Sequence, residues 1–238
     1  MTQESHSHHE DDLGHTHDHG HGHGHANDQG LSGMVRYLRL APRMWRSDVN
    51  NAVADLVAPK PDETVLDLGA GMGAGAVVVA ASGAKVVAVE PTPFLRRVLK
   101  FRRLIQKNRK RITVIDAAAE QLLVPDNSID AIWSVNTMHH WVDKRAAAVE
   151  IVRSLKPTGR LMLVDEDFSD PEHPEFERWG RRERESDDDE TEDQSHHGFT
   201  MVEADEMGEL FVAAGLTTVS AEKRLIDGRP SIVVRNSA

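Results

Sequence analysis

Three acidic side chains lie at or just after short apolar runs of this 238-residue chain, and a glycine-rich turn follows the first of them. The acids are Asp67, Glu90 and Asp116, and the turn spans residues 69–75. Glycine has no Cβ, so such a turn can adopt positive φ and lie against a ligand, while the next helix points free N–H groups at it. Carboxylates beside this turn favour a ligand that carries positive charge and hydroxyl groups.

The glycine turn by itself fits two kinds of nucleotide site. Gly69-x-Gly71-x-x-Ala74 satisfies the dinucleotide fingerprint with its permitted final alanine. A pyrophosphate is negatively charged and prefers bare amides, whereas Asp67 favours a ligand with an ammonium or sulfonium group. Glu90, about 20 residues beyond the glycines, suits ribose hydroxyls in both cases. It therefore supports a nucleoside ligand without choosing between the two.

Segments beyond the turn decide the choice. In chain order they are VLDLGAGMGAG at 65–75, VVAVEP at 86–91, IDAAAEQLLVPDNSIDAIWS at 115–134, NTMHHW at 136–141 and LKPTGRLMLVDE at 155–166. With these segments the chain resembles the class I S-adenosylmethionine-dependent methyltransferases, especially the small-molecule group that includes the ubiquinone and menaquinone biosynthetic methyltransferases. The segments have the order and spacing of that family, and the resemblance extends over most of the range 31–168.

The resemblance implies S-adenosyl-L-methionine as cofactor and a role for each matching residue. The glycines would pack against the methionine part of the cofactor, with Asp67 near its ammonium group. Glu90 would bind the ribose hydroxyls, and Asp116 with the Ala117 amide would read the adenine edge. The expected cofactor-binding set is Asp67, Gly69, Ala70, Gly71, Gly73, Glu90, Pro91, Asp116, Ala117, Ser134, Val135 and Asn136. The competing interpretation is that the glycines form only a turn and the acids only cap strand ends.

The chemistry of methyl transfer needs little from the protein, because a sulfonium already makes the methyl group electrophilic. Alignment of the acceptor and exclusion of water do most of the work. A base is needed only for a protonated acceptor, and His139 and His140 are the candidate catalytic residues, since imidazole titrates in the right range. Paired histidines at this place often serve structure in the resembling family. The candidate substrate-facing residues are Tyr37, Trp45, Trp141 and Phe168.

The elements that position these residues alternate between strands and helices. Strands are predicted at 64–68, 85–89, 112–115, 128–135 and 160–164, with helices between them and a short helix and loop at 119–126. Such alternation implies parallel pairing with right-handed crossovers. The runs 217–223 and 231–235 predict an antiparallel pair at the end. The expected fold is α/β, a doubly wound and mainly parallel seven-stranded sheet of the Rossmann-like methyltransferase type.

The chain divides into a tail and one catalytic domain. Residues 1–30 are rich in histidine and poor in apolar residues, which predicts disorder. His15, His17, His19, His21, His23 and His25 can bind Ni²⁺, Cu²⁺ or Zn²⁺ adventitiously, and a selected metal role is the alternative. Residues 31–238 form the predicted methyltransferase domain. Within it, residues 31–58 predict N-terminal helices and residues 166–200 a mobile acidic insertion or lid.

Composition excludes several classes of protein. The chain has no cysteine, so disulfides, a thiolate nucleophile and a thiolate zinc site are impossible. No apolar run is long enough to span a membrane and no secretory signal is seen, so the cytoplasm is the expected location. The methyl acceptor is expected to be a small molecule, and its identity, the atom methylated and the oligomeric state stay open.

The helix predicted at 94–111 is strongly basic, with nine cations and no acid, in a chain of net charge −11. Phe94, Leu95, Val98, Leu99, Phe101, Leu104 and Ile105 are expected to form its buried stripe. Its cations are then left for a solvated outer face, which makes nucleic acid an unlikely partner. Alternatives to small-molecule methylation are an RNA or protein methyltransferase that uses this helix, an NAD-dependent oxidoreductase, or a metal-binding regulatory protein.

Overall fold

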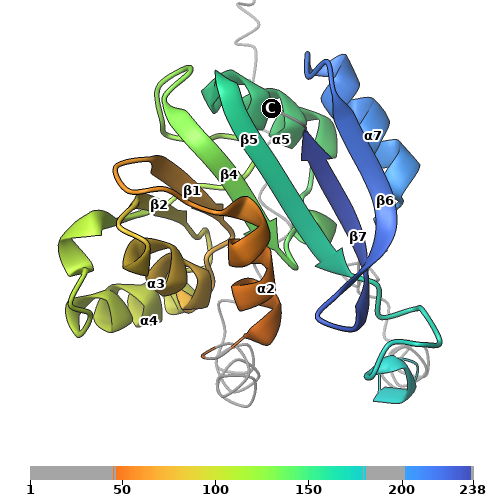
Figure 1. Ribbon diagram of the computed structural model, residues 1–238, viewed down its shortest axis with the longest axis horizontal. Helices are drawn as coiled ribbons and strands as arrows, with labels where there is room; N and C mark the ends of the chain where they lie inside the picture. The colour runs from red at the N-terminus through yellow and green to blue at the C-terminus, as the bar shows by residue number, and fades with distance from the viewer. Residues whose placement is uncertain (1–44, 46, 179, 181–201, 237–238) are drawn as a thin grey trace, which may run out of the picture.

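The computed structural model of the protein describes residues 45, 47–178, 180 and 202–236. A seven-stranded sheet with the order β3-β2-β1-β4-β5-β7-β6 forms its centre (Figure 1). The strands are β1 (Thr64–Leu68), β2 (Lys85–Val89), β3 (Ile112–Ile115), β4 (Ile129–Val135), β5 (Leu155–Glu166), β6 (Val219–Ile226) and β7 (Arg229–Asn236). The first five pair in parallel, and β7 pairs antiparallel with both β5 and β6. The predicted fold class is thereby confirmed.

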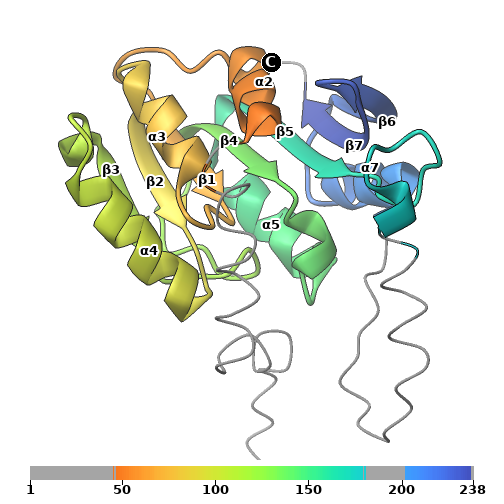
Figure 2. The same cartoon turned by 90° about the horizontal axis from the view of Figure 1, so that it is seen from below.

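Helices cover both faces of the sheet (Figure 2). They are α2 (Asp48–Val57), α3 (Ala74–Ala81), α4 (Pro93–Leu104), α5 (Lys144–Ser154) and α7 (Ala204–Ala213), with short 3₁₀ turns η2 (Arg109–Arg111) and η3 (Met138–His140). Helices α2, α3 and α4 lie on one face, and α5 and α7 lie on the other. Within the described residues, none of these helices has the length and apolar character needed to cross a bilayer.

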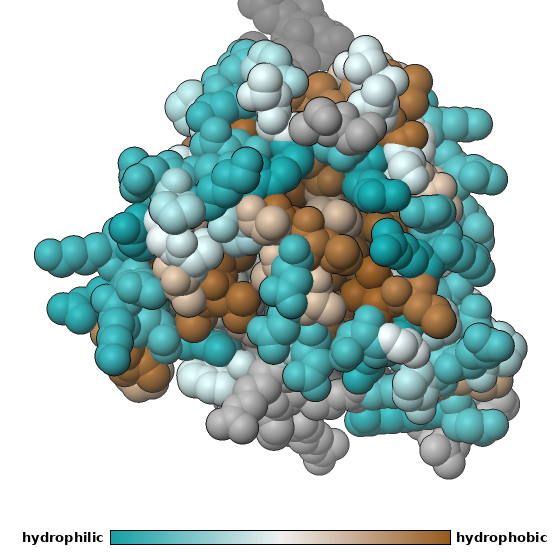
Figure 3. All heavy atoms as spheres, viewed as in Figure 1, coloured by the Kyte–Doolittle hydropathy of each residue, from teal (hydrophilic) through white to brown (hydrophobic). Residues whose placement is uncertain are grey.

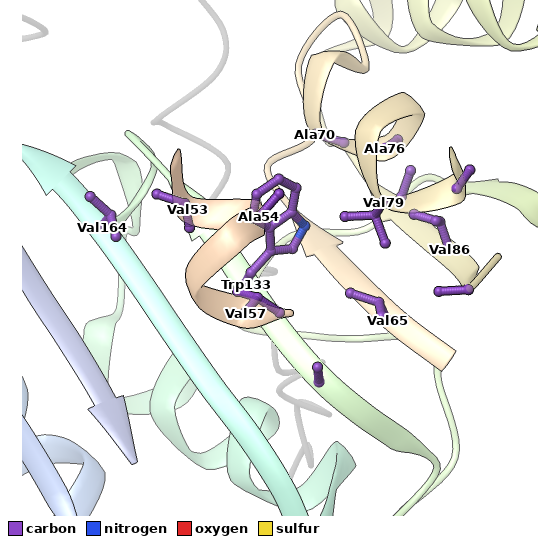
Figure 4. Close-up of a cluster of buried hydrophobic side chains, with 14 of the residues drawn as sticks. Val53, Ala54, Val57, Val65, Ala70, Ala76, Val79, Val86, Trp133 and Val164 are labelled. Carbon is purple, nitrogen blue, oxygen red and sulfur yellow. The ribbon is translucent and has the colours of Figure 1, made fainter. Parts of the chain in front are cut away.

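The sheet separates two apolar cores because both of its faces are packed against helices. On the first face, Trp133 of β4 is fully buried between α2 and α3 and contacts the cluster that includes Val53 and Val65 (Figure 4). On the second face, Ile151 of α5 and Phe211 of α7 pack against the sheet. Parallel strands covered on both faces explain why the strand sequences are nearly continuous apolar runs.

The N-terminal ends of two helices follow the rules for capping. The Ser47 hydroxyl accepts a hydrogen bond of 3.1 Å from Asn50 N at the start of α2. The carboxylate of Asp143 accepts a bond of 2.9 Å from Ala146 N at the start of α5. Each cap satisfies an N–H group that the helix itself cannot bond.

Some predicted boundaries were wrong. Residues 119–126 form a turn closed by the bridge between Ala118 and Gln121, and no helix. The Leu122 N–H donates a hydrogen bond of 2.8 Å to the Glu150 carboxylate, so this amide bonds a distant side chain and no helical carbonyl. Strand β5 is longer than expected at both ends, because Leu155 already pairs with Ile129 of β4 and Asp165 and Glu166 still pair with Ile232 and Ser231 of β7.

The predicted buried stripe of the basic helix was also partly wrong. Phe101, Leu104 and Ile105 are exposed, whereas Arg102 is 8% exposed. Leu95, Leu99 and Arg102 follow one another at spacings of four and three, so all three point at the domain. The other apolar residues of the helix's second half fall on the opposite side.

Candidate functional site

The glycine turn joins β1 to α3 and has a strained backbone that only glycine adopts readily. Gly69, Gly71 and Gly73 have φ angles of 70°, 52° and 80°. A Cβ on Gly69 would lie 2.8 Å from Cβ of Thr137, in the loop after β4. The turn is therefore held against the end of the neighbouring strand, and it leaves no room for a side chain there.

Asp67 lies beneath the turn as a buried and incompletely bonded acid. It is 5% exposed, and the Ala76 amide at the start of α3 donates to its carboxylate. Among the described residues its Oδ2 has no hydrogen-bond partner. Burial raises the pKa of the Asp67 carboxyl to about 7, and the negative charge of Glu90 adds to the rise. A buried acceptor without a partner is costly, and a cationic group nearby would offset that cost.

Glu90 connects the glycine turn to the end of β2. Its Oε2 accepts a hydrogen bond of 2.7 Å from Gly71 N, and its Oε1 accepts one of 2.8 Å from Thr92 N. The side chain is buried, so these charge-assisted bonds fix both the carboxylate and the turn.

Arg96 connects the ends of β2 and β3. Its guanidinium donates to the carbonyl oxygens of Glu90 at 2.8 Å and Pro91 at 2.7 Å, and forms an ion pair of 2.6 Å with Asp116. The Asp116 side chain is 69% exposed, so one carboxylate edge still faces outward beside Ala117. Sequence reasoning placed Arg96 among the solvated cations. Its position in the first turn of α4, directly after the Glu90 strand end, was the signal that could have identified it.

The loop after β4 closes the same edge of the sheet. Asn136 has a φ of 58°, and its side chain bonds Glu166 twice, donating to Oε1 at 2.7 Å and accepting from Glu166 N at 2.8 Å. The hydroxyls of Ser134 and Thr137 contact each other. These bonds tie the ends of β4 and β5 together, and Thr137 of the same loop lies against Gly69 of the glycine turn.

The paired histidines belong to this loop and rest on Asp165. The Asp165 carboxylate accepts bonds from the amides of Thr137, Met138 and His139 at 2.8, 3.2 and 3.0 Å. It also contacts His139 Nδ1 at 2.8 Å, and His139 Nε2 lies 3.1 Å from His140 Nε2. The His139 side chain is 7% exposed, whereas His140 is exposed. Sequence reasoning did not find Asp165, because its partners lie more than twenty residues away.

The candidate substrate residues are placed in different surroundings. The Trp45 ring lies on the Arg102 guanidinium, 4.3 Å from its ring centroid. Trp141 packs against the core on the α5 and α7 face, and Phe168 makes an edge contact of 4.7 Å between ring centroids with His173. Tyr37, the six tail histidines from His15 to His25, residues 1–30, most of residues 31–58 and the later part of 166–200 lie outside the described residues. In the described part of the chain, no group of His, Asp and Glu forms a metal-binding cluster.

The structure thus brings the predicted cofactor-binding residues to one edge of the sheet. Asp67, Glu90, Asp116 and Asn136 lie at or directly after the carboxyl ends of β1, β2, β3 and β4, which are neighbours in the sheet. Hydrogen bonds through Gly71, Glu90 and Arg96 join the ends of β1, β2 and β3 up to Asp116, whereas Asn136 is bonded to Glu166 at the end of β5. In open α/β sheets, this edge is where ligands bind.

Comparison with known proteins shows similarity to methyltransferases in sequence and in fold. Residues 66–163 match the family model described as a methyltransferase domain. A SAM-dependent methyltransferase from Aquifex aeolicus of known crystal structure superposes with a TM-score of 0.60 at 16% identity, over 86% of this chain and 98% of that one. Residues 66–163 are thus similar to a methyltransferase domain, and the fold is that of a SAM-dependent methyltransferase of known structure, in agreement with the resemblance in the sequence.

Relatives by sequence include quinone methyltransferases. The demethylmenaquinone methyltransferase of Clavibacter sepedonicus is 34% identical over 132 residues, which are 56% of this chain and 50% of that protein. The 2-methyl-6-phytyl-1,4-hydroquinone methyltransferase of Synechocystis sp. is 35% identical over 107 residues, 44% of this chain and 32% of that protein. The matches span half or less of the length of these two relatives.

Proposed function

We propose that the chain binds S-adenosyl-L-methionine at the carboxyl edge of β1 to β4 and transfers its methyl group to a small-molecule acceptor. The observation that carries the proposal is the buried Oδ2 of Asp67, which has no partner among the described residues and lies directly below the glycine turn. A cofactor with an ammonium and a sulfonium group suits such an acceptor. A dinucleotide, with its negative pyrophosphate, does not.

The other residues of this edge fit the same cofactor. Gly69, Gly71 and Gly73 leave bare backbone for close approach, and the Glu90 carboxylate beside the turn is the group suited to ribose hydroxyls. The exposed carboxylate of Asp116, held by Arg96, suits an adenine amino group. The remaining residues of the set are Ala70, Pro91, Ala117, Ser134, Val135 and Asn136.

The bound cofactor supplies an electrophilic methyl group, so the protein's own residues orient and enclose the reactants. Asp165 fixes the loop of residues 137–139, and its contact with Nδ1 fixes the His139 ring. His140 has the more exposed ring, so we propose it, and not His139, as the residue that would take a proton from an acceptor. Trp45, Trp141, Phe168 and Tyr37 stay candidates for acceptor contacts.

The names of two relatives suggest which acceptor to test first. Two of them are named for the methylation of quinones or hydroquinones, so a demethylated hydroquinone is the first acceptor to test. The cytoplasmic location and the metal affinity of the histidine tail stay predictions from the sequence.

Calorimetry on the full chain with S-adenosylhomocysteine, NAD and Ni²⁺ separates the proposal from its alternatives. We expect saturable binding of S-adenosylhomocysteine and none of NAD, with an Asp67→Asn variant losing most of the affinity. Transfer of a labelled methyl group to a demethylated hydroquinone, with tRNA and a protein lysate as competing acceptors, then tests the acceptor class. Binding of NAD instead would refute the cofactor, and labelling of tRNA or protein alone would refute the acceptor.

A further inference from the structure

The outer face of α4 carries large apolar side chains that the domain does not cover. Phe101, Leu104 and Ile105 are 63%, 62% and 61% exposed. They follow one another at the spacing that places side chains together on a helix surface. The domain is packed instead against Leu95, Leu99 and Arg102 of the same helix, so this outer face has no role in the core.

Cations surround these apolar residues. Arg97, Lys100, Lys107, Arg109 and Lys110 are exposed, and the chain has no acid from residue 94 to residue 111. In the part of the chain that the structure describes, none of these five side chains forms an ion pair. By contrast, Arg96 is paired with Asp116. The net charge of the whole chain is −11, so this positive surface is a local exception.

The grouping of exposed apolar side chains with cations distinguishes α4 from the rest of the described surface. The other large exposed hydrophobic residues occur one to each element or loop: Leu56, Leu123, Val142, Val149, Val212 and Leu225. Figure 3 shows hydrophobic surface with hydrophilic side chains beside it at the lower left edge of the molecule, where Figure 1 places α4. Grouped exposed apolar side chains mark interaction surfaces, whereas single ones do not.

We propose that the outer face of α4, defined by Arg97, Lys100, Phe101, Leu104 and Ile105 and continued by the cations of 107–110, binds the surface of an anionic lipid bilayer. Basic side chains are attracted to anionic headgroups, and aromatic and aliphatic side chains beside them enter the boundary of the acyl region. A nucleic acid would pair with the cations but has no apolar surface for Leu104 and Ile105 to enter, since its outer surface is phosphate and sugar.

Docking through the outer face of α4 would place the lipid about one helix length from the cofactor edge, because the apolar group lies at the C-terminal end of the helix. The helix starts at Pro93, three residues after Glu90, and Arg96 in its first turn holds Asp116. Its twelve residues span roughly 18 Å, so the apolar group lies within one helix length of these residues. This surface is separate from the cofactor-binding residues and does not depend on the proposed reaction.

The test is co-sedimentation of the full chain with vesicles of phosphatidylcholine alone and of phosphatidylcholine mixed with phosphatidylglycerol. We expect binding to the mixed vesicles only, weakened by added salt. Lys100→Glu combined with Leu104→Ser should lower the affinity about tenfold or more. The matched control combines Arg224→Glu with Leu225→Ser on β6, at the opposite edge of the sheet, and should leave binding within about twofold of the unaltered chain.

The altered positions are exposed and lie outside the cofactor edge, so S-adenosylhomocysteine affinity and thermal unfolding should not change in either variant. This separates the docking surface from the proposed methyl transfer. Failure of the unaltered chain to bind mixed vesicles would overturn the proposal, as would equal losses in the two variants. Salt-sensitive retention of RNA without vesicle binding would assign the surface to nucleic acid instead.

Discussion

The guanidinium of Arg102 lies 4.3 Å from the ring centroid of Trp45 and joins the segment before α2 to the glycine turn. Its Nη2 donates to the carbonyl of Trp45 at 2.9 Å, and its Nη1 lies 3.5 Å from the carbonyl of Met72. Burial lowers the pKa of Arg102, and its Nε has no partner among the described residues. A buried cation is kept at this cost because it connects two parts of the chain that are distant in sequence.

Arg102→Lys should therefore loosen the segment around Trp45 without unfolding the domain. Lysine keeps the charge but loses the planar group that stacks on the ring and reaches two carbonyls. We expect about 1–2 kcal/mol of lost stability and faster hydrogen exchange near Trp45 and Met72. Arg97→Lys on the exposed face of the same helix is the control and should change neither. Unchanged hydrogen exchange near Trp45 and Met72 in the Arg102→Lys variant would show that Arg102 does not hold these two segments together.

Gly69→Ala should be far more harmful than an alanine at another glycine of similar φ. Gly69 has a φ of 70° and faces Thr137 at less than contact distance, whereas Gly228 has a φ of 72° and no heavy atom within 4 Å. Gly228→Ala measures the backbone strain alone, about 1–2 kcal/mol. Gly69→Ala adds the clash and should cost several kcal/mol in denaturant unfolding and abolish cofactor binding. Equal losses of stability in the two variants would show that the Thr137 side chain moves aside at little cost.

Much of this fold could be predicted from the sequence because the deciding signals are local. Apolar runs ending in Asp67, Glu90 and Asp116 identify strand ends, and alternation with helices places those ends on one edge. The hydrogen bonds that complete the edge could not be predicted. Asp165 serves residues 137–139 through a strand pairing that only the folded sheet creates.

The errors on α4 have a different origin. The apolar residues of that helix were counted as one stripe, but their angular positions divide them between two faces. Arg102 falls on the inner face beside Leu99, and Phe101 falls on the outer face. Composition suggested that cations face solvent and apolar residues face the core, and the helix spacing overrode both tendencies.

Asp67→Asn should make the cofactor-free protein more stable at about pH 8 while it removes cofactor affinity. Burial, followed by the charge of Glu90, raises the pKa of Asp67 to about 7, well above its unfolded value. The folded state thus keeps a proton that the unfolded state releases between about pH 4 and pH 7, so the unfolding free energy falls as pH rises through that window. Asparagine avoids the buried charge, and the gain should be about 1–3 kcal/mol near pH 8.

The gain should shrink as pH is lowered towards about pH 5, where the unaltered Asp67 is already protonated in the folded state. The stability change caused by Glu63→Gln should depend on pH in the opposite direction. Hydrogen bonds with Arg160 lower the pKa of Glu63, so its contribution is present above the unfolded pKa and is lost as pH falls. Urea unfolding at several pH values measures both. A loss of stability in the Asp67→Asn variant near pH 8 would argue against a destabilising buried charge at Asp67.

Asp165 and the two histidines should separate into structural and chemical roles. Asp165→Ala leaves three buried or half-buried amides without their acceptor and should cost about 3 kcal/mol or more. His139→Ala removes a ring that is held by Asp165, so we expect a moderate loss of stability of about 1 kcal/mol. His140→Ala alters an exposed ring and should leave stability and cofactor affinity unchanged.

Turnover of the His140→Ala variant then decides whether a base acts at this loop. If His140 removes a proton from the methyl acceptor, turnover of the variant should fall about a hundredfold at neutral pH. It should recover as pH rises, because the methyl acceptor then loses its proton without a base. His140→Gln is the control for shape, because it can bond His139 but cannot take up a proton near neutral pH. Cofactor affinity measured on the same samples keeps binding apart from chemistry. Unchanged turnover in both variants would restrict the histidines to holding the loop against the glycine turn.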